Sequence, residues 1–188
     1  MITTFLAYII IASFLLVEGR LRKGQEAQSY ERGQFDQRST MFIGIAFFIG
    51  ILALLLALLL DWLKIAVLSA WIGWLGIGIA LSGFGIRVWA SRVLGAFYTR
   101  TLKVTENQFI VHEGPYRLIR HPGYLGSILM WIGAATATTN WIVMLITLLV
   151  MLSAYVYRIQ NEEKMLLTTN TEYAEYQAHT WRLIPFVY

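Results

Sequence analysis

The chain has 188 residues, of which 57% are hydrophobic and only 14% charged, and its net charge is +4. Soluble domains carry about 25% charged residues, so this composition excludes a disordered chain and argues against an ordinary soluble domain. The sequence contains no cysteine, which excludes disulfides, cysteine nucleophiles and thiolate metal sites. The apolar residues occur in long runs, as in integral membrane proteins. We expect no metal ligand set, and the modest charge indicates no nucleic-acid partner.

Five apolar stretches predict five transmembrane helices, at residues 2–17, 41–60, 65–90, 124–139 and 141–157. A spanning helix needs about 20 apolar residues, which the second and third stretches supply and the others approach. The first stretch has no basic residue before it and no small-residue cleavage site after it. We therefore interpret it as an anchor helix and not as a cleaved signal peptide. Only Asn140 separates the last two stretches, which predicts a tight helical hairpin.

The basic residues predict the orientation in the membrane. Apart from Lys64, and from Arg87 near the end of the third stretch, all lysines and arginines follow the first, third or fifth stretch. The positive-inside rule then places the N-terminus outside and the large loops and the C-terminal tail in the cytoplasm. Residues 162–180 have helical spacing and predict a helical tail, and residues 101–112 allow a short extended piece. The predicted fold is an all-α integral membrane protein, and the predicted location is the bacterial inner membrane.

The segment richest in chemistry is residues 111–126, which reads V-H-E-G-P-Y-R-L-I-R-H-P-G-Y-L-G. It gathers ring and charged side chains around two prolines and three glycines, and it ends where an apolar helix begins. Pro122 suits a first helical turn, where free N–H groups favour anions. The alternative is a basic cytoplasmic loop with a turn.

A second segment reads R-I-Q-N-E-E at residues 158–163. Arg158 and Glu162 are four residues apart and share a helix face, so a surface ion pair is the alternative interpretation. The predicted hairpin would bring this segment beside residues 120–124, because both flank its open end.

The third stretch is rich in glycine near its cytoplasmic end. Gly83 and Gly85 would let a ligand approach the backbone, or they would allow close helix packing. Arg87 follows them. It either extends to lipid phosphates or faces inward and holds an anion.

These motifs together resemble the isoprenylcysteine carboxyl methyltransferase family and the related phospholipid N-methyltransferases. The resemblance is carried by E-G-P-Y at 113–116, R-H-P-G-Y-L-G at 120–126 and R-x-x-x-E-E-x-x-L-L at 158–167. G-F-G-I-R-V-W-A at 83–90 and L-G-A-F-Y at 94–98 match bacterial members. The tail departs from the family because it lacks the usual Phe-Gly pair, although Tyr173 and Tyr176 remain.

The resemblance implies an integral-membrane methyltransferase that uses S-adenosylmethionine and acts on a lipophilic acceptor or membrane lipid. It divides the chain into N-terminal helices and linker (1–69) and a catalytic region (70–188) of one structural domain. The catalytic residues it implies are Arg87, Arg120, Arg158 and Glu163. The cofactor-binding residues it implies are Gly83, Gly85, His112, Gly114, Tyr116, Arg120, His121, Pro122, Tyr124, Leu125, Gly126, Glu162 and Glu163.

Several functional alternatives stay open at this stage. The acceptor is the carboxylate of an isoprenylcysteine-like compound, a phospholipid amine or a small thiol. Two rivals are a non-catalytic scaffold or small transporter and a membrane reductase with a nicotinamide cofactor. The oligomeric state is unknown.

Overall fold

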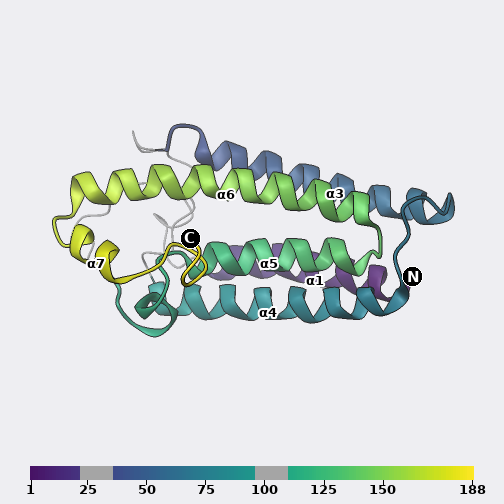
Figure 1. The fold of residues 1–188 in the computed structure, drawn as a ribbon, viewed down its shortest axis with the longest axis horizontal. Coiled ribbons are helices and arrows are strands. Elements are labelled where there is room, and N and C mark those ends of the chain that lie inside the picture. Colours follow the sequence, from purple (N-terminus) through teal and green to yellow (C-terminus); the bar gives the residue numbers. More distant parts are fainter. Residues whose placement is uncertain (22–35, 96–109) are drawn as a thin grey trace.

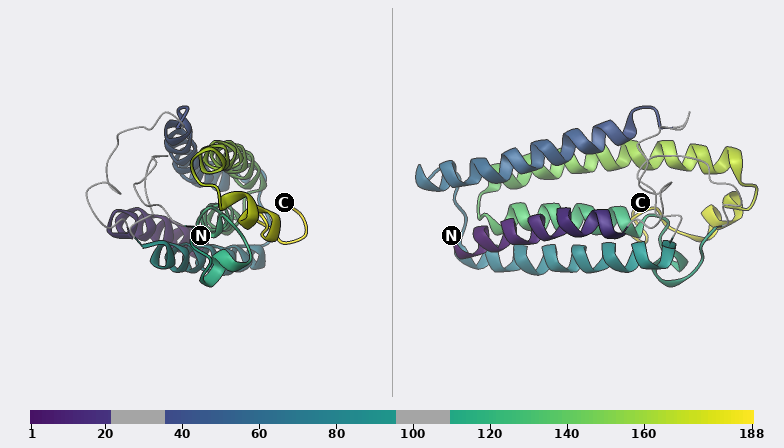
Figure 2. Two further views of the ribbon diagram at one scale, coloured as in Figure 1. Left: turned by 90° about the vertical axis from the view of Figure 1, so that its left-hand side faces the viewer. Right: turned by 180° about the vertical axis from the view of Figure 1, so that it is seen from behind.

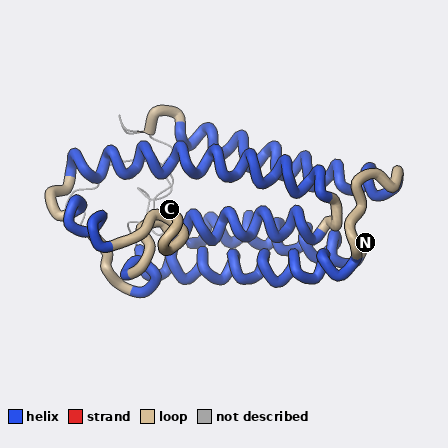
Figure 3. The backbone as a smooth tube through the Cα atoms, viewed as in Figure 1, coloured by secondary structure: helices blue, strands red, loops and turns tan. Residues whose placement is uncertain are grey.

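The computed structural model describes residues 1–21, 36–95 and 110–188, so most of the extended piece predicted at 101–112 lies outside the described residues. In these ranges the chain forms helices and connecting loops without a strand, which confirms the all-α prediction there (Figure 3). The elements are α1 (Ile2–Leu21), α3 (Ser39–Trp62), α4 (Ala70–Leu94), the 3-10 turn η2 (Gly114–Arg117), α5 (Pro122–Ala137), α6 (Trp141–Thr169) and α7 (Tyr173–His179).

The long helices run side by side in two layers (Figure 1). One layer contains α3 and α6, and the other contains α1, α5 and α4, an arrangement that is also clear in the end-on view of Figure 2. Helix α5 contacts α1, α3, α4 and α6 and therefore forms the centre of the bundle. Its residues Met130, Trp131 and Ala134 are fully buried.

Glycines hold α4 and α5 at backbone contact. A Cβ atom added at Gly83 would lie 2.4 Å from the Met130 amide nitrogen, and one at Gly133 would lie 2.3 Å from the Ala80 amide nitrogen. Real Cβ atoms do not approach so closely, so only glycine fits at these two positions. Small residues of this kind allow close helix contact in membranes.

The third helix begins later than predicted. Helix α4 starts at Ala70 and not at residue 65, because Lys64 and Ala66 adopt left-handed backbone conformations with φ of 57° and 60°. The linker before α4 instead pairs with the α5–α6 turn: the Leu68 amide donates to the Thr139 carbonyl at 2.6 Å. Apolar composition alone did not reveal this pairing.

The predicted tight hairpin between α5 and α6 is confirmed, and Asn140 fixes its turn. The Asn140 side-chain oxygen accepts hydrogen bonds from the Ile142 and Val143 amides at 3.1 and 3.3 Å, which caps α6. The side-chain nitrogen donates to the Ile65 carbonyl at 2.9 Å. One residue therefore joins both interhelical turns at this end of the bundle.

Four of the five predicted spans are helices long and apolar enough to cross a membrane: Ile2–Arg20, Ser39–Trp62, Ala70–Leu94 and Trp141–Thr169. At 1.5 Å per residue, the 16 residues of α5 extend only about 24 Å, less than the roughly 30 Å of a hydrocarbon core. The 29 residues of α6 extend about 44 Å. Helix α6 is therefore long enough to project beyond the bilayer at the end of the bundle where α5 begins.

Candidate active site at the open end of the bundle

Three segments that are far apart in the sequence meet at the end of the bundle away from the N-terminus (Figure 1). They are the segment before α5, the second half of α6 and the C-terminal tail. The tail pairs with the first segment through the backbone: the Arg120 amide donates to the Trp181 carbonyl at 2.7 Å, and the His121 amide donates to the Arg182 carbonyl at 3.1 Å. Pro122 then occupies the first turn of α5, as predicted.

Glu163 is the centre of a buried ionic cluster. It is 3% exposed, and its Oε1 accepts from Arg120 Nε at 2.9 Å and lies 3.3 Å from His121 Nε2. Its Oε2 accepts from Arg182 Nε at 2.8 Å. Three of the roughly four acceptor sites of a carboxylate are thus occupied. Burial lowers the pKa of Arg182, but the Glu163 carboxylate outweighs this effect, so the net direction is upward.

Arg120 also holds the tail helix in place. Its Nη1 donates to the carbonyls of Gln177 (3.1 Å) and Thr180. Tyr176 of α7 donates its hydroxyl to the Tyr116 carbonyl at 2.7 Å, and burial raises its pKa to about 12. Helix α7 is therefore attached to the segment that precedes α5.

A second cluster is built around Tyr124, which connects the start of α5 to Arg158 and Glu162 of α6. Its ring stacks on His121 with centroids 5.5 Å apart and an interplanar angle of 8°. Its hydroxyl donates to Glu162 Oε2 at 2.5 Å and accepts from Arg158 Nε at 3.2 Å. The predicted approach of residues 120–124 to residues 158–163 is confirmed. Arg158 and Glu162 share a helix face as expected, with the Tyr124 hydroxyl bonded to both side chains.

Arg158 has a partner that sequence reasoning missed. Its Nη1 donates to Asp36 Oδ1 at 2.9 Å, Ser39 Oγ at 2.8 Å and Thr40 Oγ1 at 2.9 Å. Asp36 is 1% exposed. The sequence offered one indication of this partner: an acidic residue five positions before the second apolar stretch, in the polar linker.

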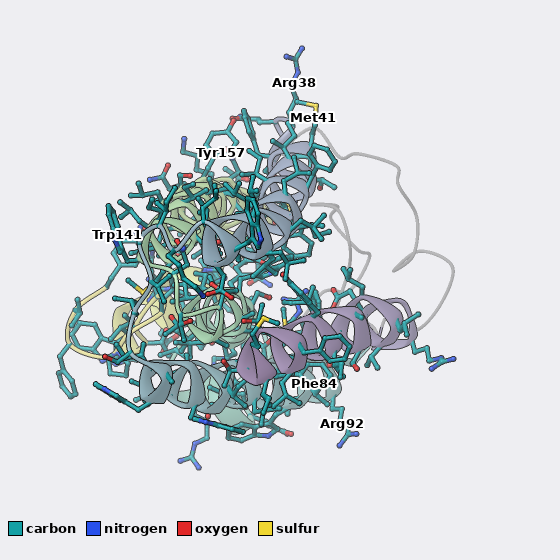
Figure 4. The ribbon with its side chains drawn as sticks, turned by 90° about the vertical axis from the view of Figure 1, so that its right-hand side faces the viewer. Arg38, Met41, Phe84, Arg92, Trp141 and Tyr157 are labelled. Carbon is teal, nitrogen blue, oxygen red and sulfur yellow. The ribbon has the colours of Figure 1, made fainter. Side chains whose placement is uncertain are left out.

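Arg87 faces inward, the second of the two alternatives considered above. It bonds Glu18 through Nε–Oε2 at 3.1 Å and Nη2–Oε1 at 2.6 Å, and its Nη1 donates to the Gly123 carbonyl at 2.9 Å. Arg92 on the same helix points away from the bundle (Figure 4). The anion that Arg87 holds is thus Glu18, a residue of α1 that the sequence analysis did not single out.

A hollow of about 510 Å³ lies beside this site. The residues that line it are His112, Arg117, Glu172, Glu175, Tyr176, His179 and Thr180. This volume is within the range of small-molecule pockets, about 300–1,000 Å³. His112 is exposed and contacts Tyr176 edge-on at 4.8 Å. Among the described residues, no group of His, Asp and Glu side chains is arranged to bind a metal ion.

Tyr173 of α7, for which the sequence analysis predicted no role, has a buried hydroxyl. It is 2% exposed, and its hydroxyl has no hydrogen-bond partner within the described parts of the chain. Burial, followed by the negative charges of Glu163 and Glu162, raises its pKa. A buried hydroxyl without a partner is unfavourable by about 1–3 kcal/mol, so a ligand oxygen or nitrogen would stabilise this position.

The remaining predicted residues do not join these clusters. Gly83 and Gly126 lie in the α4–α5 contact, where each faces the backbone of the other helix. Gly85 is exposed, with no atom near the position of an added Cβ. Leu125 packs against the apolar core. Gly114 begins η2 with a φ of 56°, a left-handed conformation that favours glycine.

The architecture is shared with a membrane protein of known structure. It matches the structure of a eukaryotic intramembrane Ras methyltransferase, isoprenylcysteine carboxyl methyltransferase, with a TM-score of 0.65 and 21% identity. The match covers 96% of this chain and 63% of that one. The two proteins therefore share an all-helical fold.

The sequence places the chain within a particular family. The pattern of the phospholipid methyltransferase family matches residues 71–170, more than half of the sequence, and the chain belongs to this family. The resemblance inferred from the motifs is thereby confirmed.

Two curated relatives are each 28% identical to the chain. Protein-S-isoprenylcysteine O-methyltransferase B of Arabidopsis thaliana aligns over 120 residues, which cover 62% of this chain and 61% of the relative. Cobalt-zinc-cadmium resistance protein CzcN of Cupriavidus metallidurans aligns over 114 residues, which cover 61% of this chain and 48% of the relative. The chain thus spans between about half and three fifths of the length of these relatives.

Proposed function

We propose that the protein is an S-adenosylmethionine-dependent methyltransferase that acts on a lipophilic acceptor at the end of the bundle where α5 begins. The observation that carries this proposal is the convergence of residues 112–126, the 158–163 segment and the tail around buried charges. Family membership and the shared fold support the reaction class. The preferred acceptor is the carboxylate of an isoprenylcysteine-like compound. A phospholipid amine or a small thiol is the second candidate, and membership of the phospholipid methyltransferase family supports the phospholipid.

The residues fit such a cofactor, which carries an amino-acid group, a ribose diol, an adenine ring and a sulfonium. Glu162 is half-buried and bonds Tyr124, so most of its acceptor sites stay available for an ammonium or a ribose hydroxyl. Glu163, with three partners, instead positions Arg120 and His121. The Tyr173 hydroxyl and the neighbouring hollow provide a further hydrogen-bonding group and space.

When bound, S-adenosylmethionine would supply an electrophilic methyl group to the acceptor and would leave as S-adenosylhomocysteine. The protein contributes proximity and orientation, which are worth up to about 7–11 kcal/mol in favourable cases. Aromatic faces such as that of Tyr124 favour a sulfonium cation. A carboxylate acceptor would be oriented by Arg87 or Arg158, in competition with Glu18 and Asp36. An amine or thiol acceptor must lose a proton, and Glu163 or His112 would be the base that accepts it.

We further propose five membrane crossings, with the N-terminus outside, in a bacterial inner membrane. The distribution of lysines and arginines supports this topology. The active site then faces the cytoplasm, where a water-soluble cofactor would reach it. In this arrangement α5 crosses in the shelter of four neighbouring helices, which compensates for its short length.

The test is a transfer assay with methyl-labelled S-adenosylmethionine, total membrane lipids and a prenyl-cysteine analogue. Label in the prenyl-cysteine ester supports the preferred acceptor, and label in a lipid amine or a thiol supports the second candidate. Titration with S-adenosylhomocysteine and with a reduced nicotinamide distinguishes the rival classes. Binding of the nicotinamide alone would favour a reductase, and binding of neither together with no transfer would favour the scaffold or transporter.

A further inference from the structure

The last eight residues form a closed loop with one buried side. The amides of Leu183 and Ile184 both donate to a backbone oxygen of Tyr188, at 2.8 and 3.0 Å. The Leu183 side chain is 5% exposed and packs in the core of the bundle. The Trp181 and Phe186 rings touch at the other side, with centroids 5.3 Å apart. We refer to residues 181–188 as the C-terminal hook.

The outer side of the hook is strongly apolar. Phe186 is 86% exposed, Val187 75%, Ile184 49% and Trp181 39%. Leu118, in the segment that the hook pairs with, is 55% exposed. Exposed apolar surface is unfavourable in water by about 25 cal/mol per Å², and a contiguous patch of this kind marks an interaction site. The hook also projects sideways from the bundle, as the left panel of Figure 2 shows.

Helix geometry places the hook at the membrane boundary. A hydrocarbon core of roughly 30 Å corresponds to about 20 helical residues, so a core that starts at Trp141 ends near residue 161 of α6. The hook bonds the backbone at residues 118–121, directly before α5, and its Arg182 reaches Glu163 of α6. Both contacts place the hook at this level along the bundle axis.

The hook lies level with an exposed tryptophan, Trp89. Trp89, near the end of α4, is 52% exposed, while Trp62, Trp71, Trp74 and Trp141 towards the opposite end are 76%, 67%, 57% and 47% exposed. Tryptophan is enriched at both membrane–water interfaces. The hook adds Trp181 to Trp89 at the site end.

We propose that the C-terminal hook is an interfacial anchor whose apolar side inserts into the lipid headgroup region. Its position next to the lipid-facing helices and its level in the bundle point to a bilayer as the partner. A second copy of the chain is a poor fit, because a stable interface buries about 800 Å² on each partner and the hook offers only eight residues. Arg182 lies in the hook, so lipid contact would hold this arginine against Glu163.

The experiment uses the full chain, which has no native cysteine. Phe186→Cys and, as a matched control, Ala178→Cys on the exposed side of α7 are each labelled with an environment-sensitive fluorophore. The labelled proteins are reconstituted in phosphatidylcholine–phosphatidylglycerol vesicles that contain nitroxide lipids, with the nitroxide near the headgroup or deep in the chain. Aqueous iodide serves as the second quencher.

At position 186 we expect the shallow nitroxide to remove about half of the fluorescence and iodide to have little effect, because interfacial groups insert about 5–10 Å. The control at position 178 should show the reverse. Iodide quenching equal at both positions would overturn the proposal. Protection from iodide without nitroxide quenching would also overturn it and would indicate a protein partner. Val187→Cys repeats the test at a second site, and no readout depends on methyl transfer.

Discussion

Replacing Glu162 and Glu163 by glutamine, one at a time, separates a role in cofactor binding from a role in stability. Glu163→Gln removes the negative charge shared by Arg120, His121 and Arg182, of which the first two have side chains only 6% and 4% exposed. Breaking a buried pair costs about 3–5 kcal/mol. We expect Glu163→Gln to lower the free energy of unfolding by about 3 kcal/mol. The loss lies at the lower end of the range because the amide keeps one acceptor oxygen and Arg182 is 35% exposed.

Glu162→Gln should act on binding and spare stability. Glu162 is half-buried and bonds the Tyr124 hydroxyl, so its loss should change the free energy of unfolding by less than about 1 kcal/mol. A hydrogen bond from a ligand to a charged group is worth about 1.5–3 kcal/mol, which is about 10–150-fold in affinity. We therefore expect the affinity for S-adenosylhomocysteine to fall by this factor.

The assay combines denaturant unfolding in detergent micelles with calorimetric titration of S-adenosylhomocysteine at a temperature where every variant is folded. Lys164→Gln is the matched control, because Lys164 is the next residue of α6 and is exposed. It should change neither quantity. If Glu162→Gln binds as tightly as the parent, Glu162 does not hold the cofactor. If Glu163→Gln is as stable as the control, the reasoning on its buried charge is wrong.

Three further outcomes are expected. Gly83→Ala should lower stability by at least about 1–3 kcal/mol through overpacking, whereas Gly85→Ala should raise it by up to about 1 kcal/mol through helix propensity; equal thermal midpoints would contradict the backbone contact. Glu18→Gln should lower the free energy of unfolding by about 3 kcal/mol, because buried Arg87 loses the charge of the Glu18 carboxylate, and adding Arg87→Met should restore part of this loss. A double variant less stable than Glu18→Gln would contradict the pairing. A cysteine at Lys64 should react with membrane-impermeant maleimide in intact cells, and reaction only after lysis would reverse the proposed orientation.

The sequence was sufficient to predict the parts of the site that are governed by local rules. Asn140 alone separated two apolar stretches, and this spacing forced the hairpin that brings Tyr124 to Arg158 and Glu162. Pro122 marked the start of α5 because its ring suits a first helical turn.

The long-range partners could not be predicted in the same way. Asp36 lies 122 residues from Arg158, and Glu18 lies 69 residues from Arg87. No periodicity connects such residues, since their pairing depends on how helices in different parts of the chain pack. Gly83 illustrates the same limit: a glycine suits both a ligand and a neighbouring helix, and only the position of Met130 shows that α5 fills the space beside it.

The two interhelical turns have a mechanical consequence. Both lie at the end of the bundle opposite the site, and backbone hydrogen bonds join them there: Leu68 to Thr139 and Trp141 to Ala66. At the site end, ionic side chains such as Glu163 and Arg120 connect α6 to the other layer. The two layers are therefore joined by backbone hydrogen bonds at one end of the bundle and by ionic side chains at the other. Neutralising Glu163 would therefore loosen the contact between the layers at the site end, while the backbone hydrogen bonds at the opposite end would stay in place.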